Sequence, residues 1–163
     1  MSDVLTVADI GHEVLAEFLR RFDLELIVQS TGDVITGRYC GDAEAGIVGR
    51  SVFVRPDTPV HSLLHESSHV ICMDGDRRSR LDRDAGGDDL EESAVCYLQI
   101  VLADHIAGVG RERIMDDMDA WGYSFRLGST RAWFENDADD AKEFLLNHNL
   151  IDTSGEPTYS LRP

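Results

Sequence analysis

One short segment constrains the fold of this chain more than any other: residues 65–69 read His-Glu-Ser-Ser-His. Residues four apart lie on one face of an α-helix, so the imidazoles of His65 and His69 can hold one metal ion between them. Glu66 would then project beside the ion, where a carboxylate can take a proton from a metal-bound water. The segment therefore predicts a helix that carries two metal ligands and a general base.

The flanking residues support a helix over about residues 59–74. Thr58 is a good N-cap, and Pro59 suits the first helical position, where a missing N–H costs nothing. Gly75 can end the helix in a left-handed cap.

His61 lies one helical turn before His65 and shares its face. His61 and His69 are separated by a rise of about 12 Å, whereas zinc–nitrogen bonds are about 2.0–2.1 Å. All three histidines therefore cannot bind one ion. We expect His61 to be a polar residue near the helix start, a residue at the rim of a pocket, or a partner of a metal ligand.

A catalytic zinc site usually has three protein ligands and one open position, and a second predicted helix offers the third. Residues 74–89 are polar and contain glycine, which indicates a loop. Asp88 or Asp89 then caps a helix that runs to about residue 106, with Glu91 and Glu92 in its first turn.

The two glutamates lie about 100° apart around this helix. Glu91 shares a face with the apolar residues Ala94, Val95, Leu98 and Leu102, whereas Glu92 lies toward Cys96 and Gln99. Because a ligand must face the first helix, and the apolar stripe indicates the inward side, Glu91 is the favoured third ligand and Glu92 the alternative. Both would also be explained as ordinary acids near a helix N-terminus.

The His65-Glu66-x-x-His69 segment, a loop and then Glu91-x-x-Ala94 resemble the glutamate-type (gluzincin-like) zinc metallopeptidases. The closest resemblance is to the small bacterial peptidases that cleave phage or stress-response repressors, and it covers about residues 7–106. It implies Zn²⁺ as cofactor and hydrolysis of peptide bonds in a protein or peptide. The family often has Asn or Asp four residues after the glutamate, where this chain has Val95.

A weaker resemblance points to different chemistry. Leu64 and the following His-Glu-Ser-Ser-His, with Asp42-Ala43-Glu44 upstream, are similar to segments of bacterial elongation-factor hydroxylases. That resemblance implies Fe²⁺, oxygen and a protein-lysine substrate. Two histidines and one carboxylate suit both metals, so the spacing leaves zinc and iron open. A metal-binding module without catalysis is a third possibility.

The predicted fold is α+β. An amphipathic leading helix begins with a capping box at Thr6 and ends near Phe22. Strands are expected at residues 24–28, 34–39, 45–48 and 51–55, of which three or four form a small mixed or antiparallel sheet, because the connections are too short for crossovers. Residues 45–49 are a candidate edge for binding a peptide by strand addition.

Two further helices are expected after the glutamate helix, at residues 111–121 and 130–147. The aromatic loop between them, residues 121–128, can border a pocket. Peptide hydrolysis also needs a donor to the oxyanion, and Tyr123 in this loop is the leading candidate. The other candidates are Tyr97, His105, Arg131 and His148.

The length of 163 residues indicates a single domain, with a core at 7–106, a helical extension at 107–150 and a loose tail at 151–163. Acids outnumber bases 31 to 15, a net charge of −16 that disfavours nucleic acid as a partner. No apolar run is long enough to cross a membrane, and the first residues are not typical of a secretion signal. Three scattered cysteines, Cys40, Cys72 and Cys96, favour free thiols and a cytoplasmic location.

Overall fold

The computed structural model describes residues 3–38, 42–82 and 85–163 and has the expected α+β architecture. Its sheet consists of β1 (Glu25–Val28), β2 (Gly46–Val48) and β3 (Ser51–Val54) in the order β1-β3-β2. β3 pairs parallel with β1 and antiparallel with β2, so the sheet is mixed. The strand predicted at 34–39 is wrong over residues 34–38, which are irregular, and Tyr39 lies outside the described residues.

The predicted leading helix is two helices, α1 (Val7–Ile10) and α2 (His12–Arg20). Thr6 and Asp9 form the predicted capping box. Gly11 divides the helices because its φ of +100° is outside the helical range and in a region that glycine adopts without strain. α2 packs on the sheet through Leu15, Phe18 and Leu19, all of which are buried.

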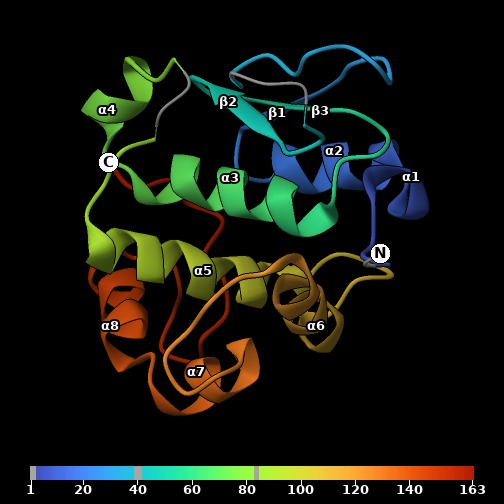
Figure 1. The fold of residues 1–163 in the computed structure, drawn as a ribbon. Coiled ribbons are helices and arrows are strands. Elements are labelled where there is room, and N and C mark those ends of the chain that lie inside the picture. Colours follow the sequence, from blue (N-terminus) through green and yellow to red (C-terminus); the bar gives the residue numbers. More distant parts are fainter. Residues whose placement is uncertain (1–2, 39–41, 83–84) are drawn as a thin grey trace.

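The motif helix, α3 (Val60–Cys72), forms the middle layer of the molecule (Figure 1). The sheet and α2 lie on one side of it, and α5 (Asp89–Ala103) runs alongside on the other. Its predicted ends shift by a residue or two. Pro59 is the N-cap in place of the predicted Thr58, whose hydroxyl accepts a hydrogen bond from the Arg55 amide. Gly75 does not cap the end of α3 but begins the short helix α4 (Gly75–Ser79) within the predicted loop.

The far side of α5 is also covered (Figure 1). α8 (Asp139–Asn147) packs along it, and α6 (Arg111–Trp121) packs beside both α5 and α3. The single helix predicted at 130–147 divides near Asp137, where φ is −139°, into α7 (Thr130–Asn136) and α8. α5 is therefore enclosed on several sides, and ten of its fifteen residues are buried.

Residues 151–163 are docked on the core, and the predicted loose tail is wrong. The Tyr159 ring packs against Phe18 and Phe22 of the α2 region. The Arg162 amide donates to the Ile71 carbonyl near the end of α3, and the Arg162 carbonyl accepts from Arg78. The last residues therefore lie beside the end of the motif helix (Figure 1).

Within the described ranges, no helix has the length and apolar character needed to cross a lipid bilayer.

Candidate metal centre

His65 and His69 project from α3 toward one carboxylate of α5, that of Glu92. The Nε2 atom of His65 lies 3.0 Å from one oxygen of Glu92, and the Nε2 atom of His69 lies 3.0 Å from the other. One ligand atom from each residue lies within 4.8 Å of the others. Hydrogen bonds from both histidines lower the pKa of Glu92, although burial opposes this. Two adjacent helices thus bring two nitrogens and a carboxylate to a common point.

Glu91, the favoured third ligand, points elsewhere, and that prediction is wrong. Its carboxylate is buried and receives two hydrogen bonds of 2.8 Å from Arg77. Arg162 contacts the same carboxylate at 3.3 Å. Glu91 therefore joins the loop after α3 and the last residues of the chain to the start of α5.

The apolar stripe failed as a guide because α5 is enclosed. α3 packs on one side of it and α8 on another, so a buried position does not indicate which neighbour it faces. The face toward α3 is instead marked by polar residues at helical spacing, namely Glu92, Cys96 and Gln99. That polar row was the sequence signal for the glutamate that faces the two histidines.

Gln99 lies at the candidate site, and the sequence interpretation did not predict it. It is fully buried, and its Oε1 lies 3.0 Å from His65 Nδ1. Its Nε2 donates to the His61 carbonyl at 2.7 Å and to the Tyr123 hydroxyl at 3.3 Å. Gln99 thereby contacts a predicted metal ligand and the leading candidate for the oxyanion donor.

Tyr123 lies at the site, as its place in the aromatic loop suggested. Its hydroxyl is 3.2 Å from His61 Nδ1, and its ring is 5.8 Å from the His65 ring. Burial raises the pKa of Tyr123, which keeps its hydroxyl protonated at neutral pH. The other candidate donors make contacts elsewhere: Tyr97 stacks on Phe134, His105 pairs with Glu156, Arg131 pairs with Glu112, and His148 packs on Phe144.

His61 is buried beside the metal centre and lines its pocket. The Trp121 ring covers it at a centroid distance of 5.1 Å. Burial lowers the pKa of His61 to about 4, so its imidazole is neutral at physiological pH. Of the three interpretations, a residue at the edge of a pocket describes His61 best. His61 also contacts Gln99, which in turn contacts His65.

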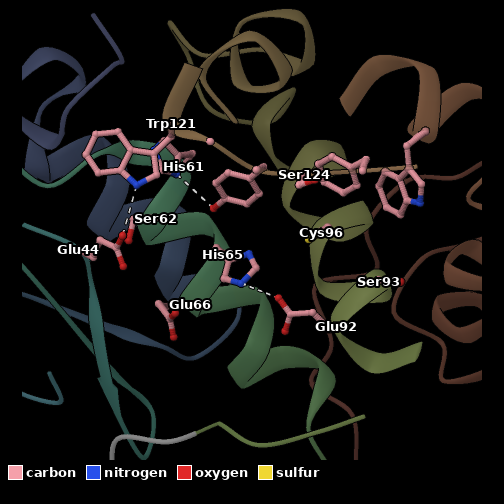
Figure 2. A pocket seen from close by; sticks show the side chains of 14 residues that line it. Glu44, His61, Ser62, His65, Glu66, Glu92, Ser93, Cys96, Trp121 and Ser124 are labelled. Carbon is pink, nitrogen blue, oxygen red and sulfur yellow. Dashed lines mark hydrogen bonds and ion pairs between the residues drawn. The ribbon is translucent and has the colours of Figure 1, made fainter. Parts of the chain in front are cut away.

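Glu66 lies beside the candidate metal centre, and in Figure 2 it is on the opposite side of His65 from Glu92. Among the described residues it takes part in no hydrogen bond or ion pair of its own. Burial raises its pKa, although the nearby histidines and Arg38 act in the opposite direction. An acid with a raised pKa and no fixed partner is suited to accept and release a proton.

One pocket of about 620 Å³ is lined by His61, His65, Glu66, Glu92 and Tyr123. One wall carries the acids Glu44, Glu66 and Glu92. The other is the aromatic loop with Trp121, Tyr123 and Phe125, together with Trp133 of α7. The Trp121 indole N–H donates to Glu44 at 3.3 Å and joins the two walls at one end (Figure 2). The pocket reaches His65 and Glu92 of the candidate metal centre.

β2 is an edge strand, as expected for the segment proposed to add a peptide. Its outer side is partly covered, because a Cβ on Gly37 would come within 2.8 Å of the Ile47 amide nitrogen. The chain at residues 36–37 therefore lies against this edge, and a peptide would have to displace it to pair there.

Two imidazole nitrogens and one carboxylate from adjacent helices fit Zn²⁺ and equally fit non-haem iron. No protein-family model, curated protein or solved structure matches the chain. The chemistry of the centre has to be inferred from its own geometry.

Proposed function

We propose that this protein is a zinc-dependent peptidase that hydrolyses peptide bonds in a protein or peptide substrate. One observation carries the proposal: the Nε2 atoms of His65 and His69 converge on Glu92, and His65 and Glu92 line a pocket that also contains Glu66. Three such ligands leave a position for a reactant, which is typical of catalytic rather than structural zinc sites.

The residues of the chain supply the remaining chemistry. Zinc, when bound, lowers the pKa of a water molecule toward ~7 and polarises the scissile carbonyl. Glu66 would take a proton from the attacking water as the water oxygen bonds to the carbonyl carbon. Glu66 then delivers the proton to the leaving nitrogen as the C–N bond breaks. Within the described parts of the chain its carboxylate has no hydrogen-bond or ion-pair partner, which supports this role.

Tyr123 is proposed as the donor to the developing oxyanion. It lies on the pocket wall opposite Glu66, and its hydroxyl stays protonated because burial raises its pKa. A single donor of this kind typically contributes about 10²–10³-fold to kcat.

An iron-dependent hydroxylase is the alternative, because two histidines and a carboxylate also form the iron site of many oxygenases. Glu66 favours hydrolysis, since a hydroxylase has no evident use for a general base beside the metal. A metal-bearing module without catalysis is the remaining alternative.

The experiment is metal analysis of the purified protein, followed by activity tests with each metal restored. Zinc should restore cleavage of a peptide mixture, and iron with oxygen should give no oxygen consumption above background. Glu66→Gln should retain zinc and lose at least about 10²–10⁴-fold in cleavage rate. Cleavage by Glu66→Gln at the parent rate would exclude Glu66 as the base, and turnover with iron alone would favour the hydroxylase.

We propose a reducing, cytoplasmic location for this activity. Cys72 and Cys96 are buried free thiols, which is typical of proteins in a reducing compartment. Cys40 lies outside the described residues.

A further inference from the structure

Gln99 lies between the metal centre and Tyr123 and contacts both. We infer that Gln99 is the positioning residue that turns the His65 ring so that Nε2 faces the metal and Nδ1 keeps its hydrogen. This inference rests on the proposed metal site. Gln99 lies seven residues after Glu92, and the sequence did not indicate this role for it.

The first step fixes the orientation of the Gln99 amide. Its Nε2 lies 2.7 Å from the His61 backbone carbonyl, which can only accept a hydrogen bond. The amide group at that position must therefore be the NH₂. The Gln99 oxygen consequently faces His65.

The second step fixes the hydrogen of His65. The Gln99 oxygen lies 3.0 Å from His65 Nδ1, and an amide oxygen accepts but never donates. Nδ1 must therefore carry a hydrogen, which leaves Nε2 as the nitrogen that can bind a metal. That atom is the one 3.0 Å from Glu92. His69 has no such restraint from any described residue, because its buried Nδ1 finds no hydrogen-bond partner among them.

The third step connects the ligand to Tyr123. The second N–H of the Gln99 amide donates to the Tyr123 hydroxyl at 3.3 Å. The Tyr123 oxygen therefore acts as an acceptor toward Gln99, and its own hydrogen is directed either to His61 Nδ1 or into the pocket. One buried amide thus sets the orientation of a ligand and of the proposed oxyanion donor.

The test compares zinc dissociation constants, measured by chelator competition, for the parent, Gln99→Leu and Tyr123→Phe. Gln99→Leu should weaken zinc binding about 10–100-fold, the usual effect of removing the partner of a metal-binding histidine. Tyr123→Phe is the matched control, since it keeps the Gln99 contacts with His65 and the His61 carbonyl and should bind zinc like the parent. In ¹⁵N spectra of the zinc-loaded parent, His65 should coordinate through Nε2 and retain a hydrogen-bonded Nδ1–H.

Each outcome decides. The inference is overturned if Gln99→Leu binds zinc as tightly as the parent, or if His65 of the parent coordinates zinc through Nδ1. The spectrum of the parent still provides the test if Gln99→Leu does not fold. Weaker zinc binding in Gln99→Leu but not in Tyr123→Phe supports the inference. That support holds even if the parent cleaves no peptide, a result that would contradict only the proposed peptidase activity. A parent that binds no zinc removes both the inference and the proposed function.

Discussion

At the scale of single residues, two adjacent glutamates have opposite environments. Glu92 is half exposed and faces two histidines, whereas Glu91 is buried and faces two arginines. The first arrangement suits a ligand that has to meet a metal and a substrate. The second suits a structural ion pair, in which removing one partner leaves a charge without compensation.

This contrast predicts opposite effects of the same substitution. Glu92→Gln should weaken zinc binding by about 100-fold and change the free energy of unfolding of the metal-free protein by less than about 1 kcal/mol. Glu91→Gln should lower that free energy by about 2–4 kcal/mol while zinc affinity stays within a few-fold of the parent. Chelator competition and urea unfolding of both variants measure the two quantities. A loss of zinc affinity confined to Glu91→Gln would restore the original assignment.

The part of the site that could be predicted from sequence is the part set by local helical geometry. His65, Glu66 and His69 lie on one helix, so their spacing determined their arrangement. Glu92 could not be chosen from one helix alone, because the choice depended on which neighbour each face of α5 meets. Gln99 was missed because its three partners come from α3 and the loop after α6.

At the scale of elements, β2 is held in place by close backbone contacts as well as by its pairing with β3. A Cβ on Gly46 would lie 2.1 Å from the Thr36 carbonyl oxygen, a backbone atom that cannot turn aside. The preceding residue, Ala45, donates its amide to the Ser62 hydroxyl of α3 at 2.9 Å. The position of β2 is thereby linked to the motif helix.

Gly46→Ala should therefore destabilise the protein by more than about 2 kcal/mol, because the backbone at residue 36 or β2 itself has to move. Gly49→Ala is the matched control in the same hairpin. Gly49 has a φ of +59° and nothing within 4 Å of an added Cβ, so only a backbone cost of about 1 kcal/mol is expected. Thermal or urea unfolding of the two variants gives the comparison, and equal losses would contradict the contact at Gly46.

Element type was more predictable from sequence than element ends. Thr6 and Asp88 cap helices as expected, because a capping side chain acts on amides within its own turn. The divisions at Gly11 and Asp137 were missed, since hydrophobic periodicity continues across both and conceals the break. The segment at 34–38 has a strand-like composition, but it finds no strand partner among the described residues.

At the scale of the whole molecule, the last residues connect parts that are distant in sequence. The Arg162 side chain reaches the Cys72 carbonyl at the end of α3 and the Glu91 carboxylate at the start of α5. The local composition of the last residues suggested a loose tail. The sequence could not reveal the docking, because contacts across 71 and 90 residues leave no local pattern.

Arg162→Ala should lower the free energy of unfolding by about 1–3 kcal/mol, since a buried carboxylate and a helix-end carbonyl both lose a donor. Arg80→Ala is the control, because Arg80 pairs with Asp76 where both side chains are exposed. Its loss should be below about 0.5 kcal/mol. Equal, small effects in urea unfolding would show that the docked tail adds little to stability.

Metal binding should stabilise the whole fold without being required for it. The core extends from Val7 to Ile151, so the metal-free chain is expected to fold, unlike a zinc finger. Zinc joins α3 to α5 only in the folded state, and free zinc at about 100 times its Kd stabilises by about 2.7 kcal/mol. In a chain of this size that raises Tm by about 5–10 °C.

Differential scanning calorimetry with zinc or with a chelator measures this shift. Glu92→Gln should lose most of it, because a Kd about 100-fold higher leaves less than about 0.5 kcal/mol of stabilisation at the same zinc concentration. Glu91→Gln should begin from a lower Tm and still rise by about the parent's increment. A parent Tm that zinc leaves unchanged would mean that the convergence of His65, His69 and Glu92 does not form a metal site, because a ligand bound only by the folded state must raise its melting temperature.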